Sequence, residues 1–404
     1  MSTIPPAQAP AAPKNTQPLW ADQYPELSRE PIAIDYLHEQ KYFDLEREKI
    51  FRKCWLYVGR VEEIPSPNGF MVADIEICNA SVLIVKDQQG KLAAFHNICK
   101  HRLNKLTYEK SGSAGSFVCH YHAWAYDRKG KLRRVPDEEA FYGLDKSTCD
   151  LTSVAVDEWR GLIFICLDPS PRQSLQEYLE VIPEKLEQFP FERLTAAVHA
   201  EKVLEVNWKT GAHTNMESYH AEQLHNRPTL FEPDFSGNPG GRPIHLQLFD
   251  RHRMYSYGGR EHVKFANPTP LFLKMRECAP MPQFPGTNVG DKNKWVGDNW
   301  FIFPNLLLGT MHGNLAILQY WPLAVNRSRF KYTWYYKQPE TIREAFGTKL
   351  EYVRQVNVLA GDMWAGDRVQ EGLATGAAKT MVLGDSEICI RHEHEVYMRE
   401  LGLA

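Results

Sequence analysis

Two short motifs, each with one cysteine and one histidine, limit most strongly what this chain can fold into. Cys99-x-His101 and Cys119-x-x-His122 each follow a β-prone segment. Because each motif supplies one residue of each kind, we expect two loops to clamp one centre. Two cysteines and two histidines hold either a mononuclear zinc ion or a [2Fe–2S] cluster with the cysteines on one iron and the histidines on the other. Zinc fingers usually pair Cys with Cys and His with His, so the alternation favours the cluster.

The segments around these motifs are short and β-prone. From about Gly59 to Asp168 the sequence contains FMVADI, SVLIVKD, KLAAFHN, SFVCHYHAWAYD and GLIFICLD, all rich in Val, Ile and Phe. Turn-forming pairs such as Gln89-Gly90 and Lys129-Gly130 separate them. The pattern predicts an all-β unit of roughly a hundred residues that carries both motifs.

Length and composition limit the remaining possibilities. The chain has 404 residues, enough for two domains with cores of their own. Its formal net charge of −3 provides no electrostatic footprint for nucleic acid. No apolar run has the length of a membrane span, and the N-terminus lacks the basic-then-apolar order of a signal peptide. The cysteines are scattered, as expected for reduced thiols in a cytoplasmic protein.

The rest of the chain is expected to combine helices and strands. Residues 2–18 are rich in proline and alanine and should be disordered. Residues 226–295 are irregular, rich in Pro, Gly and aromatic residues, and too long for a plain connector. The last helix carries His392 and His394 among charged residues, which predicts that both are solvated. The expected helices are Glu39–Val58, Ser174–Gln188, Thr341 to about Leu373 and Glu387–Leu401, and Ala196–Val206 is expected to be a strand.

A second group of histidines lies at 207–225, which reads NWKTGAHTNMESYHAEQLH. Glu217 and His220 share a face if this segment is helical. His225 lies about 140° further round an ideal helix, so both histidines serve one centre only if the helix ends there, as Asn226-Arg227-Pro228 predicts. Two imidazoles and a carboxylate form the facial triad of a non-haem Fe(II) oxygenase. The alternative is two surface histidines beside a helix end.

Together these motifs resemble those of the α (terminal oxygenase) subunit of Rieske non-haem iron oxygenases, also called aromatic-ring-hydroxylating dioxygenases. The family's Cys-x-His-Arg and Cys-Pro-Tyr-His-Gly-Trp correspond to Cys99–Arg102 and Cys119–Trp124. Its Asn-Trp-Lys and Asp/Glu-x-Tyr-His-x4-His correspond to Asn207–Lys209 and Glu217–His225, and the resemblance extends from about residue 40 to the C-terminus. It implies a Rieske [2Fe–2S] cluster on Cys99, His101, Cys119 and His122, and a mononuclear Fe(II) on His220 and His225.

Some residues depart from the family pattern. Leu103 replaces the usual Gly after His-Arg, and His120 and Ala123 replace Pro and Gly in the second loop. These positions shape the backbone, so the loop geometry and the cluster potential can differ while the ligands stay. His213-Thr214 stands where the family often has Glu-Asn, so an active-site asparagine is not carried over.

The third iron ligand is expected to be Asp362. Glu222 is closer in sequence, but the resemblance places the carboxylate on a late helix, here VRQVNVLAGDMWAGDRVQEGL. Asp362 lies on the apolar stripe with Leu359 and Gly366, whereas Asp367 faces a more polar side. A carboxylate directed into a core needs a cation, which Fe(II) would provide. The alternative is a buried aspartate bonded to a helix end or an arginine.

The resemblance implies a two-domain α+β protein. The cluster would pass electrons to the mononuclear Fe(II), which activates O2 beside an aromatic or polycyclic hydrophobic substrate. Because no Gly-rich nucleotide fingerprint follows a strand, the electrons would come from a ferredoxin or a flavin reductase. The implied parts are a disordered tail (1–18), a helical segment packing on the catalytic domain (19–54), a Rieske β-sandwich domain (55–170), and a catalytic domain with the helix-grip (START-like) antiparallel sheet and helices (171–404).

In the family, a head-to-tail trimer brings one subunit's Rieske domain against the next subunit's iron. By that resemblance, Glu217 would connect His220 of its own chain with His122 of the partner subunit, in a homotrimer with or without a β subunit. Two other functions remain open. One is a Rieske mono-oxygenase or oxidative demethylase, and the other is a non-catalytic protein with a structural zinc.

Overall fold

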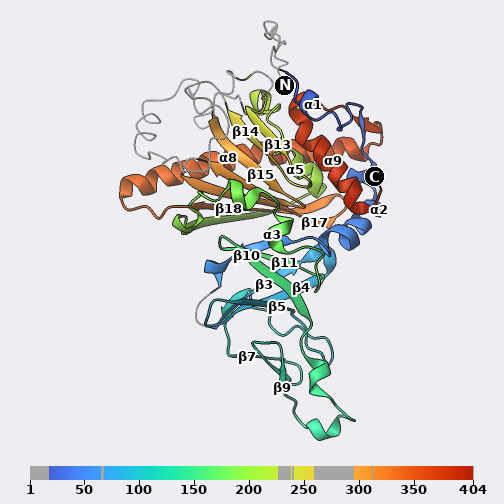
Figure 1. The fold of residues 1–404 in the computed structure, drawn as a ribbon, viewed down its shortest axis with the longest axis vertical. Coiled ribbons are helices and arrows are strands. Elements are labelled where there is room, and N and C mark those ends of the chain that lie inside the picture. The colour runs from blue at the N-terminus through green and yellow to red at the C-terminus, as the bar shows by residue number, and fades with distance from the viewer. Residues whose placement is uncertain are drawn as a thin grey trace, which may run out of the picture.

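The computed structural model describes residues 18–64, 68–225, 238, 241–258, 295–311 and 313–403. Figure 1 shows two sheet-based parts, with strands β2 to β11 in the lower part and those from β12 onward, together with β1, in the upper part. Most of the predicted disordered tail and of the predicted irregular region lies outside the described residues. Among the described residues, no helix combines the length and the apolar character needed to cross a bilayer.

The lower part consists of two antiparallel sheets, which confirms the predicted all-β unit. Seven strands pair in the order β2-β11-β10-β5-β4-β3-β6, and three short ones in the order β7-β8-β9. A core that includes Phe95, Phe117, Trp124 and Tyr126 joins the two sheets. The elements are β2 (Leu56–Arg60), η3 (Val61–Glu63), β3 (Gly69–Ile75), η4 (Glu76–Cys78), β4 (Ala80–Lys86), β5 (Leu92–His96), β6 (Ser111–Ser113), β7 (Ser116–Val118), β8 (Ala125–Asp127), β9 (Leu132–Arg134), η5 (Glu138–Ala140), η6 (Lys146–Cys149), β10 (Ser153–Trp159) and β11 (Leu162–Cys166).

The upper part is built on a second antiparallel sheet of seven strands in the order β12-β18-β17-β16-β15-β14-β13. Along β18, buried residues alternate with more exposed ones, as expected for a strand whose two faces differ. The predicted strand at 196–206 is confirmed as β12. The strands are β12 (Ala196–Leu204), β13 (His245–Leu248), β14 (Arg253–Gly258), β15 (Trp295–Ile302), β16 (Leu306–Met311), β17 (Asn314–Ala324) and β18 (Arg327–Tyr336).

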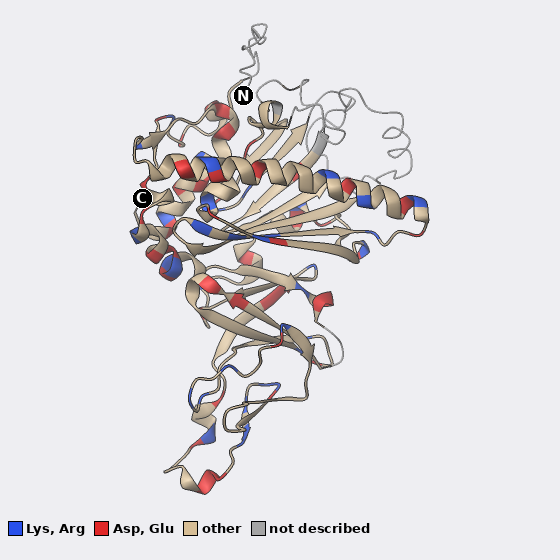
Figure 2. Cartoon of the chain, turned by 180° about the vertical axis from the view of Figure 1, so that it is seen from behind, with Lys and Arg blue, Asp and Glu red and all other residues tan. Residues whose placement is uncertain are grey.

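Two long helices complete the upper part as predicted. They are α8 (Ile342–Ala374) and α9 (Ile388–Leu401), joined through β19 (Thr380–Met381) and η8 (Asp385–Glu387). The side chain of Thr341 accepts a hydrogen bond from the backbone N–H of Glu344 at 3.1 Å, which explains where α8 begins. Figure 2 shows α8 running across the sheet, with charged residues spread along its length.

The N-terminal segment departs from the expected helix Glu39–Val58. After α1 (Trp20–Gln23), β1 (Ile32–Ala33) and η1 (Asp35–Leu37), helix α2 (Gln40–Leu45) passes into the π-helical turn η2 (Glu46–Phe51). The last part of the prediction was wrong because Leu56–Arg60 pairs with β11 instead, and sheet pairing outweighs local helical periodicity.

The expected helix Ser174–Gln188 is two short helices, α3 (Leu175–Tyr178) and α4 (Ile182–Lys185), followed by η7 (Phe191–Arg193). Glu180 breaks it with a left-handed φ of 55°. Its carboxylate accepts hydrogen bonds from the backbone N–H groups of Asp250 and Arg251 at 3.1 and 3.2 Å, which holds it in that conformation. Pro183 lies in the first turn of α4, where its missing N–H costs nothing.

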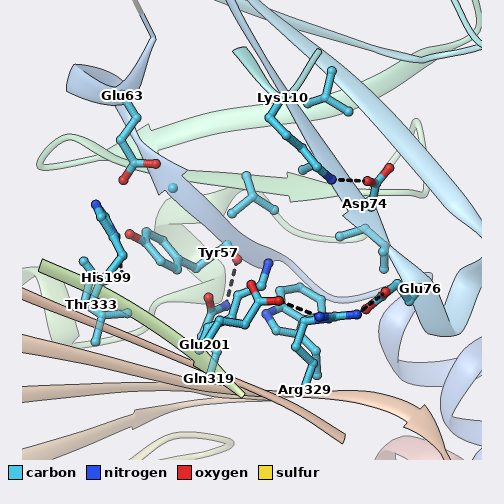
Figure 3. Close-up of a pocket in the computed structure, with 18 of the residues that line it drawn as sticks. Tyr57, Glu63, Asp74, Glu76, Lys110, His199, Glu201, Gln319, Arg329 and Thr333 are labelled. Atoms are coloured by element: carbon cyan, nitrogen blue, oxygen red, sulfur yellow. Dashed lines mark hydrogen bonds and ion pairs between the residues drawn. The ribbon is translucent and has the colours of Figure 1, made fainter. Parts of the chain in front are cut away.

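The two parts meet across a polar groove of about 650 Å³ (Figure 3). Gln319 donates from Nε2 to the carbonyl of Tyr57 at 2.9 Å. Arg329 of β18 contacts Glu76 of η4 at 2.8 Å and Glu201 of β12 at 2.5 Å. Arg329 therefore ties the lower sheet to the upper one.

Candidate active site

The two Cys/His loops share one pattern of backbone hydrogen bonds. In each, the cysteine N–H donates to the carbonyl five residues later, and the cysteine carbonyl accepts from the N–H four residues later. The distances are 2.8 and 3.0 Å for Cys99, and 2.8 and 2.9 Å for Cys119. That fourth residue, Leu103 or Ala123, has a left-handed φ of 59° or 55°. Glycine adopts this conformation without strain, so both substitutions keep the loop shape at a conformational cost.

The four predicted cluster residues come together in two pairs. The thiols of Cys99 and Cys119 are close enough that each shifts the pKa of the other, and the rings of His101 and His122 are 4.5 Å apart between centroids. This matches a cluster with sulfur ligands on one iron and imidazoles on the other. Nδ1 of His122 is buried without a hydrogen-bond partner, and a metal bond would compensate such an unpaired nitrogen. The residues therefore fit a Rieske cluster.

Neighbouring polar groups point at the two thiols. The Tyr126 hydroxyl lies 3.4 Å from Sγ of Cys99 and accepts a hydrogen bond from the Lys100 N–H at 3.0 Å. Nδ2 of Asn104 lies 3.8 Å from Sγ of Cys119. Hydrogen bonds to cluster sulfurs adjust the reduction potential. The sequence reasoning missed Asn104, because its contact crosses from one loop to the other.

The predicted iron residues converge on one point. His220 and His225 flank the short helix α6 (Ala221–Leu224), so the helix does end where both histidines can serve one centre. Their Nε2 atoms are 3.2 Å apart. Oδ1 of Asp362 on α8 lies 2.9 Å from Nε2 of His225 and 3.3 Å from Nε2 of His220. Such a facial arrangement of two imidazoles and a carboxylate suits Fe(II).

The electrostatics of this triad favour a divalent cation. Burial raises the pKa of Asp362, but hydrogen bonds with His220 and His225 outweigh it and hold that pKa below the usual value. For His220, burial lowers the pKa, while hydrogen bonds to Asp362 and Glu217 raise it to about 10. Gly361 leaves room for the His225 ring, since a Cβ there would lie 3.2 Å from its Cε1.

Glu217 does not lie on a helix, which corrects the expectation for the 207–225 segment. The chain leaves α5 (Trp208–His213) and reaches Glu217 through a turn before α6. One carboxylate oxygen of Glu217 accepts the His220 backbone N–H at 3.1 Å, and the other lies 2.5 Å from Nδ1 of His220. The carboxylate thus fixes the ring nitrogen that faces away from the triad.

Two sheet residues clamp the loop that carries Glu217. The Tyr255 hydroxyl lies 3.1 Å from the Asn215 carbonyl and 3.2 Å from the Glu217 carbonyl. Nδ2 of Asn299 donates to that hydroxyl at 3.1 Å and to the Asn215 carbonyl at 3.3 Å. Sequence reasoning missed Tyr255 and Asn299, because no local pattern shows that β14 and β15 pass under this loop.

Other candidate histidines have structural partners. Nε2 of His213 contacts Oε2 of Glu393 at 2.7 Å. The expectation that His392 is solvated was wrong: it is 8% exposed, and its Nε2 contacts the Phe249 carbonyl at 2.9 Å. Burial lowers the pKa of His392 to about 3, so the ring is neutral. The side chain of Glu222, the rejected alternative ligand, lies outside the described residues.

A pocket of about 110 Å³ opens beside the triad, between the sheet and α8. Its apolar lining comes from both sides, with Leu307 and Leu318 on the sheet and Leu359 on the helix. Asn299 and Tyr257 add polar atoms. The arrangement can hold a small, largely apolar molecule next to a metal ion.

Comparison with known proteins supports both halves of this description. Residues 191–402 match the model of the ring hydroxylating alpha subunit (catalytic domain), and residues 54–155 match that of the Rieske [2Fe-2S] domain. The chain is 28% identical over 222 residues to the glycine betaine monooxygenase oxygenase subunit of Chromohalobacter salexigens, covering 54% of this chain and 49% of that protein. It is 32% identical over 197 residues to the 2-aminobenzenesulfonate 2,3-dioxygenase subunit alpha of Alcaligenes sp, covering 47% and 49%. The chain thus spans about half the length of the curated relatives it matches.

A solved structure shares the whole fold. The quaternary ammonium Rieske monooxygenase whose structure gives insights into carnitine oxidation and inter-subunit electron transfer superposes with a TM-score of 0.75. The match covers 94% of this chain and 97% of that chain at 18% sequence identity. The α+β fold expected from the sequence is confirmed, with a Rieske domain and a catalytic domain built on an antiparallel sheet.

Proposed function

Because the chain belongs to the Rieske oxygenases, in the family of ring-hydroxylating α subunits, we propose that it is a terminal oxygenase component. It would take electrons from a ferredoxin or a flavin reductase and add oxygen from O2 to an aromatic or other hydrophobic small molecule. The observation that carries this proposal is the convergence of His220, His225 and Asp362 at the pocket.

Each residue of the site has a distinct part in this chemistry. A bound Fe(II) would supply the activation of O2. Asp362 contributes the negative charge that two neutral imidazoles lack. The Glu217 carboxylate accepts a hydrogen bond from Nδ1–H of His220, which directs Nε2 of that ring at His225 and Asp362. The apolar lining keeps water away from the reacting centre.

A mono-oxygenase that acts on a small alkylated molecule is the second candidate. The similarity to the glycine betaine monooxygenase subunit favours it. Turnover with ¹⁸O₂ and a reconstituted reductase separates the two, since a dioxygenase places both labelled atoms in the product and a mono-oxygenase places one. A protein that holds both metals, accepts electrons and yet forms no oxygenated product from either substrate class would contradict the proposal.

Electron transfer in this protein would occur between subunits. In Figure 1, β7 and β9 lie at one end of the molecule, near the second cluster loop, whereas α8 crosses the opposite part. Leu103 and Tyr121 beside the cluster residues are 68% and 53% exposed, and Tyr219 beside His220 is 59% exposed. Exposed apolar groups at both sites suit a contact between copies. We therefore propose a head-to-tail homotrimer in which Glu217 joins His220 to His122 of the partner subunit.

Glu217→Gln tests this arrangement. The variant should keep both metals and the trimer, and the ferredoxin or flavin reductase should still reduce its cluster. Reoxidation by O2 with substrate should slow by orders of magnitude, because the amide no longer holds both imidazoles. Stopped-flow absorbance measures the rate. Glu205→Gln, at a side chain that is 73% exposed, is the control. A wild-type reoxidation rate in Glu217→Gln with both irons present would refute the bridge.

A further inference from the structure

One row of paired residues crosses five strands of the sheet, and its first four members lie in the floor of the pocket. Tyr255 pairs with Asn299, Asn299 with Gly309, Gly309 with Ala316 and Ala316 with Trp334. Residues directly opposite each other in adjacent strands point to the same face of a sheet. Trp334 packs near Tyr352 of α8, with ring centroids 5.9 Å apart, so this face is the one that α8 covers. The third and fourth positions of the row, Gly309 and Ala316, carry almost no side chain.

The backbone does not require glycine at position 309. The register of β16 against β17 is regular from Leu306 to Met311, and Gly309 is not among the residues with positive φ. A Cβ on Gly309 would lie 3.3 Å from Cβ of Ala316 and 3.5 Å from Cε of Met311. A shift of a few tenths of an ångström would accommodate an alanine there. Glycine inside a strand weakens it and often marks a place where a ligand comes close.

The space over Gly309 and Ala316 adjoins the triad. Both residues line the same pocket as His220, His225 and Asp362. Protein interiors are close-packed and rarely keep voids larger than a water molecule. A gap maintained by two small residues beside a metal site is therefore expected to be filled by a ligand.

The edge of this floor is polar. Both N–H groups of the Asn299 amide face the Asn215 carbonyl and the Tyr255 hydroxyl. Its Oδ1 then turns towards the floor and lies 3.6 Å from the position of a Cβ on Gly309. An acceptor in that place suits a ligand that has an N–H or O–H group at its edge.

We propose that Gly309 and Ala316 determine the size of the substrate, and that the substrate is a planar ring compound with an N–H or O–H donor directed at Asn299. This inference rests on the proposed function, because it takes the pocket beside the triad as the substrate site. The bare backbone of the floor offers a flat surface to a ring. Added methyl groups at 309 or 316 would close the space from below.

Phenol and 2-naphthol are suitable probes, because each has one O–H and they differ by one ring. Binding is measured by calorimetry on the metal-loaded protein, for wild type, Ala316→Val and the milder Gly309→Ala. One extra or missing methylene in a hydrophobic pocket changes the discrimination between two substrates by about 10–200-fold. The ratio of the dissociation constants for 2-naphthol and phenol should therefore rise about tenfold or more in Ala316→Val, and less in Gly309→Ala. Ala324→Val, on the same strand but not in the pocket, should leave the ratio unchanged.

The outcomes separate the inference from the function. An unchanged ratio in both pocket variants, or a wild-type protein that binds neither probe, overturns the size determinant. Wild-type protein that binds phenol but forms no oxygenated product with reductase, O2 and both metals present counts against the proposed function. In that case the binding ratios still decide the role of Gly309 and Ala316.

Discussion

Replacing Glu46 by glutamine should destabilise the packing of the N-terminal helical segment against the catalytic domain. Glu46 lies on the π-helical turn η2 and is 1% exposed. Its carboxylate accepts hydrogen bonds from Nε1 of Trp208 at 2.8 Å, from Nζ of Lys209 and from the Tyr397 hydroxyl. A glutamine in its place has one accepting oxygen, and its NH₂ group would face a donor.

The magnitude follows from what remains buried. The Lys209 side chain is 0% exposed, so Glu46→Gln leaves an ammonium group in the core without the carboxylate that binds it. Breaking a buried ion pair in this way costs about 3–5 kcal/mol. A domain of 150–250 residues loses about 2–4 °C in unfolding temperature per kcal/mol, which predicts a decrease of roughly 6–20 °C.

Thermal unfolding followed by far-ultraviolet circular dichroism measures the effect, while visible absorbance of the cluster reports on the Rieske domain separately. Glu39→Gln is the matched control, because it removes an exposed ion pair. The Lys41 side chain of this pair is 61% exposed and the Glu39 side chain is 41% exposed. Exposed pairs contribute little, so the control should unfold like the wild type. If Glu46→Gln unfolds at the temperature of the control, the reasoning about the buried charge is refuted.

Three further predictions concern the two metal sites. Leu103→Gly and Ala123→Gly should each raise the stability of the Rieske domain by up to about 1 kcal/mol, because they relieve a left-handed φ; lower stability in denaturant titrations of both would contradict this. Asp362→Ala should lose the mononuclear iron and all oxygenation while the Rieske spectrum stays intact, and the assignment fails if metal analysis finds that iron retained while Glu222→Ala loses it. Tyr255→Phe should lower the free energy of unfolding by about 1–3 kcal/mol, because the part-buried Glu217 carbonyl loses its donor and the Asn299 amide loses an acceptor; chemical denaturation that matches the wild type would show that the clamp does not matter.

Local patterns predicted the parts of the structure that local interactions determine. Thr341 caps α8 through the N–H of Glu344, so both the sequence and the structure start the helix there. The buried stripe that includes Leu359 and Gly366 placed Asp362 on the covered face of α8. The spacing within 99–101 and 119–122 reflects one loop shape used twice, and that shape is local too.

The failures share a cause, which is contact between distant segments. Leu56 to Val58 fall within the expected helix Glu39–Val58, but the pairing of β2 with β11 takes them into the sheet. Glu180 interrupts a helical pattern because the backbone at 250–251 binds its carboxylate. His392 lies on a helix with many charged residues, and only the neighbouring Phe249 carbonyl makes its burial tolerable. None of these partners can be recognised from the nearby sequence.

The separation of the two metal sites within one chain has a consequence for mixed assemblies. In a head-to-tail ring, each working junction combines the cluster of one chain with the iron site of another. Chains that lack the cluster, such as Cys119→Ser, and chains that lack the iron, such as Asp362→Ala, would each be inactive alone. If the two variants are mixed in equal amounts, unfolded and reassembled, about a quarter of the junctions should be active. Each junction needs an intact cluster on one chain and an intact iron site on the next, and each of these has an even chance. In the proposed ring, a defect in either site would thus be borne by the neighbouring chain, and activity would be a property of adjacent pairs and not of single polypeptides.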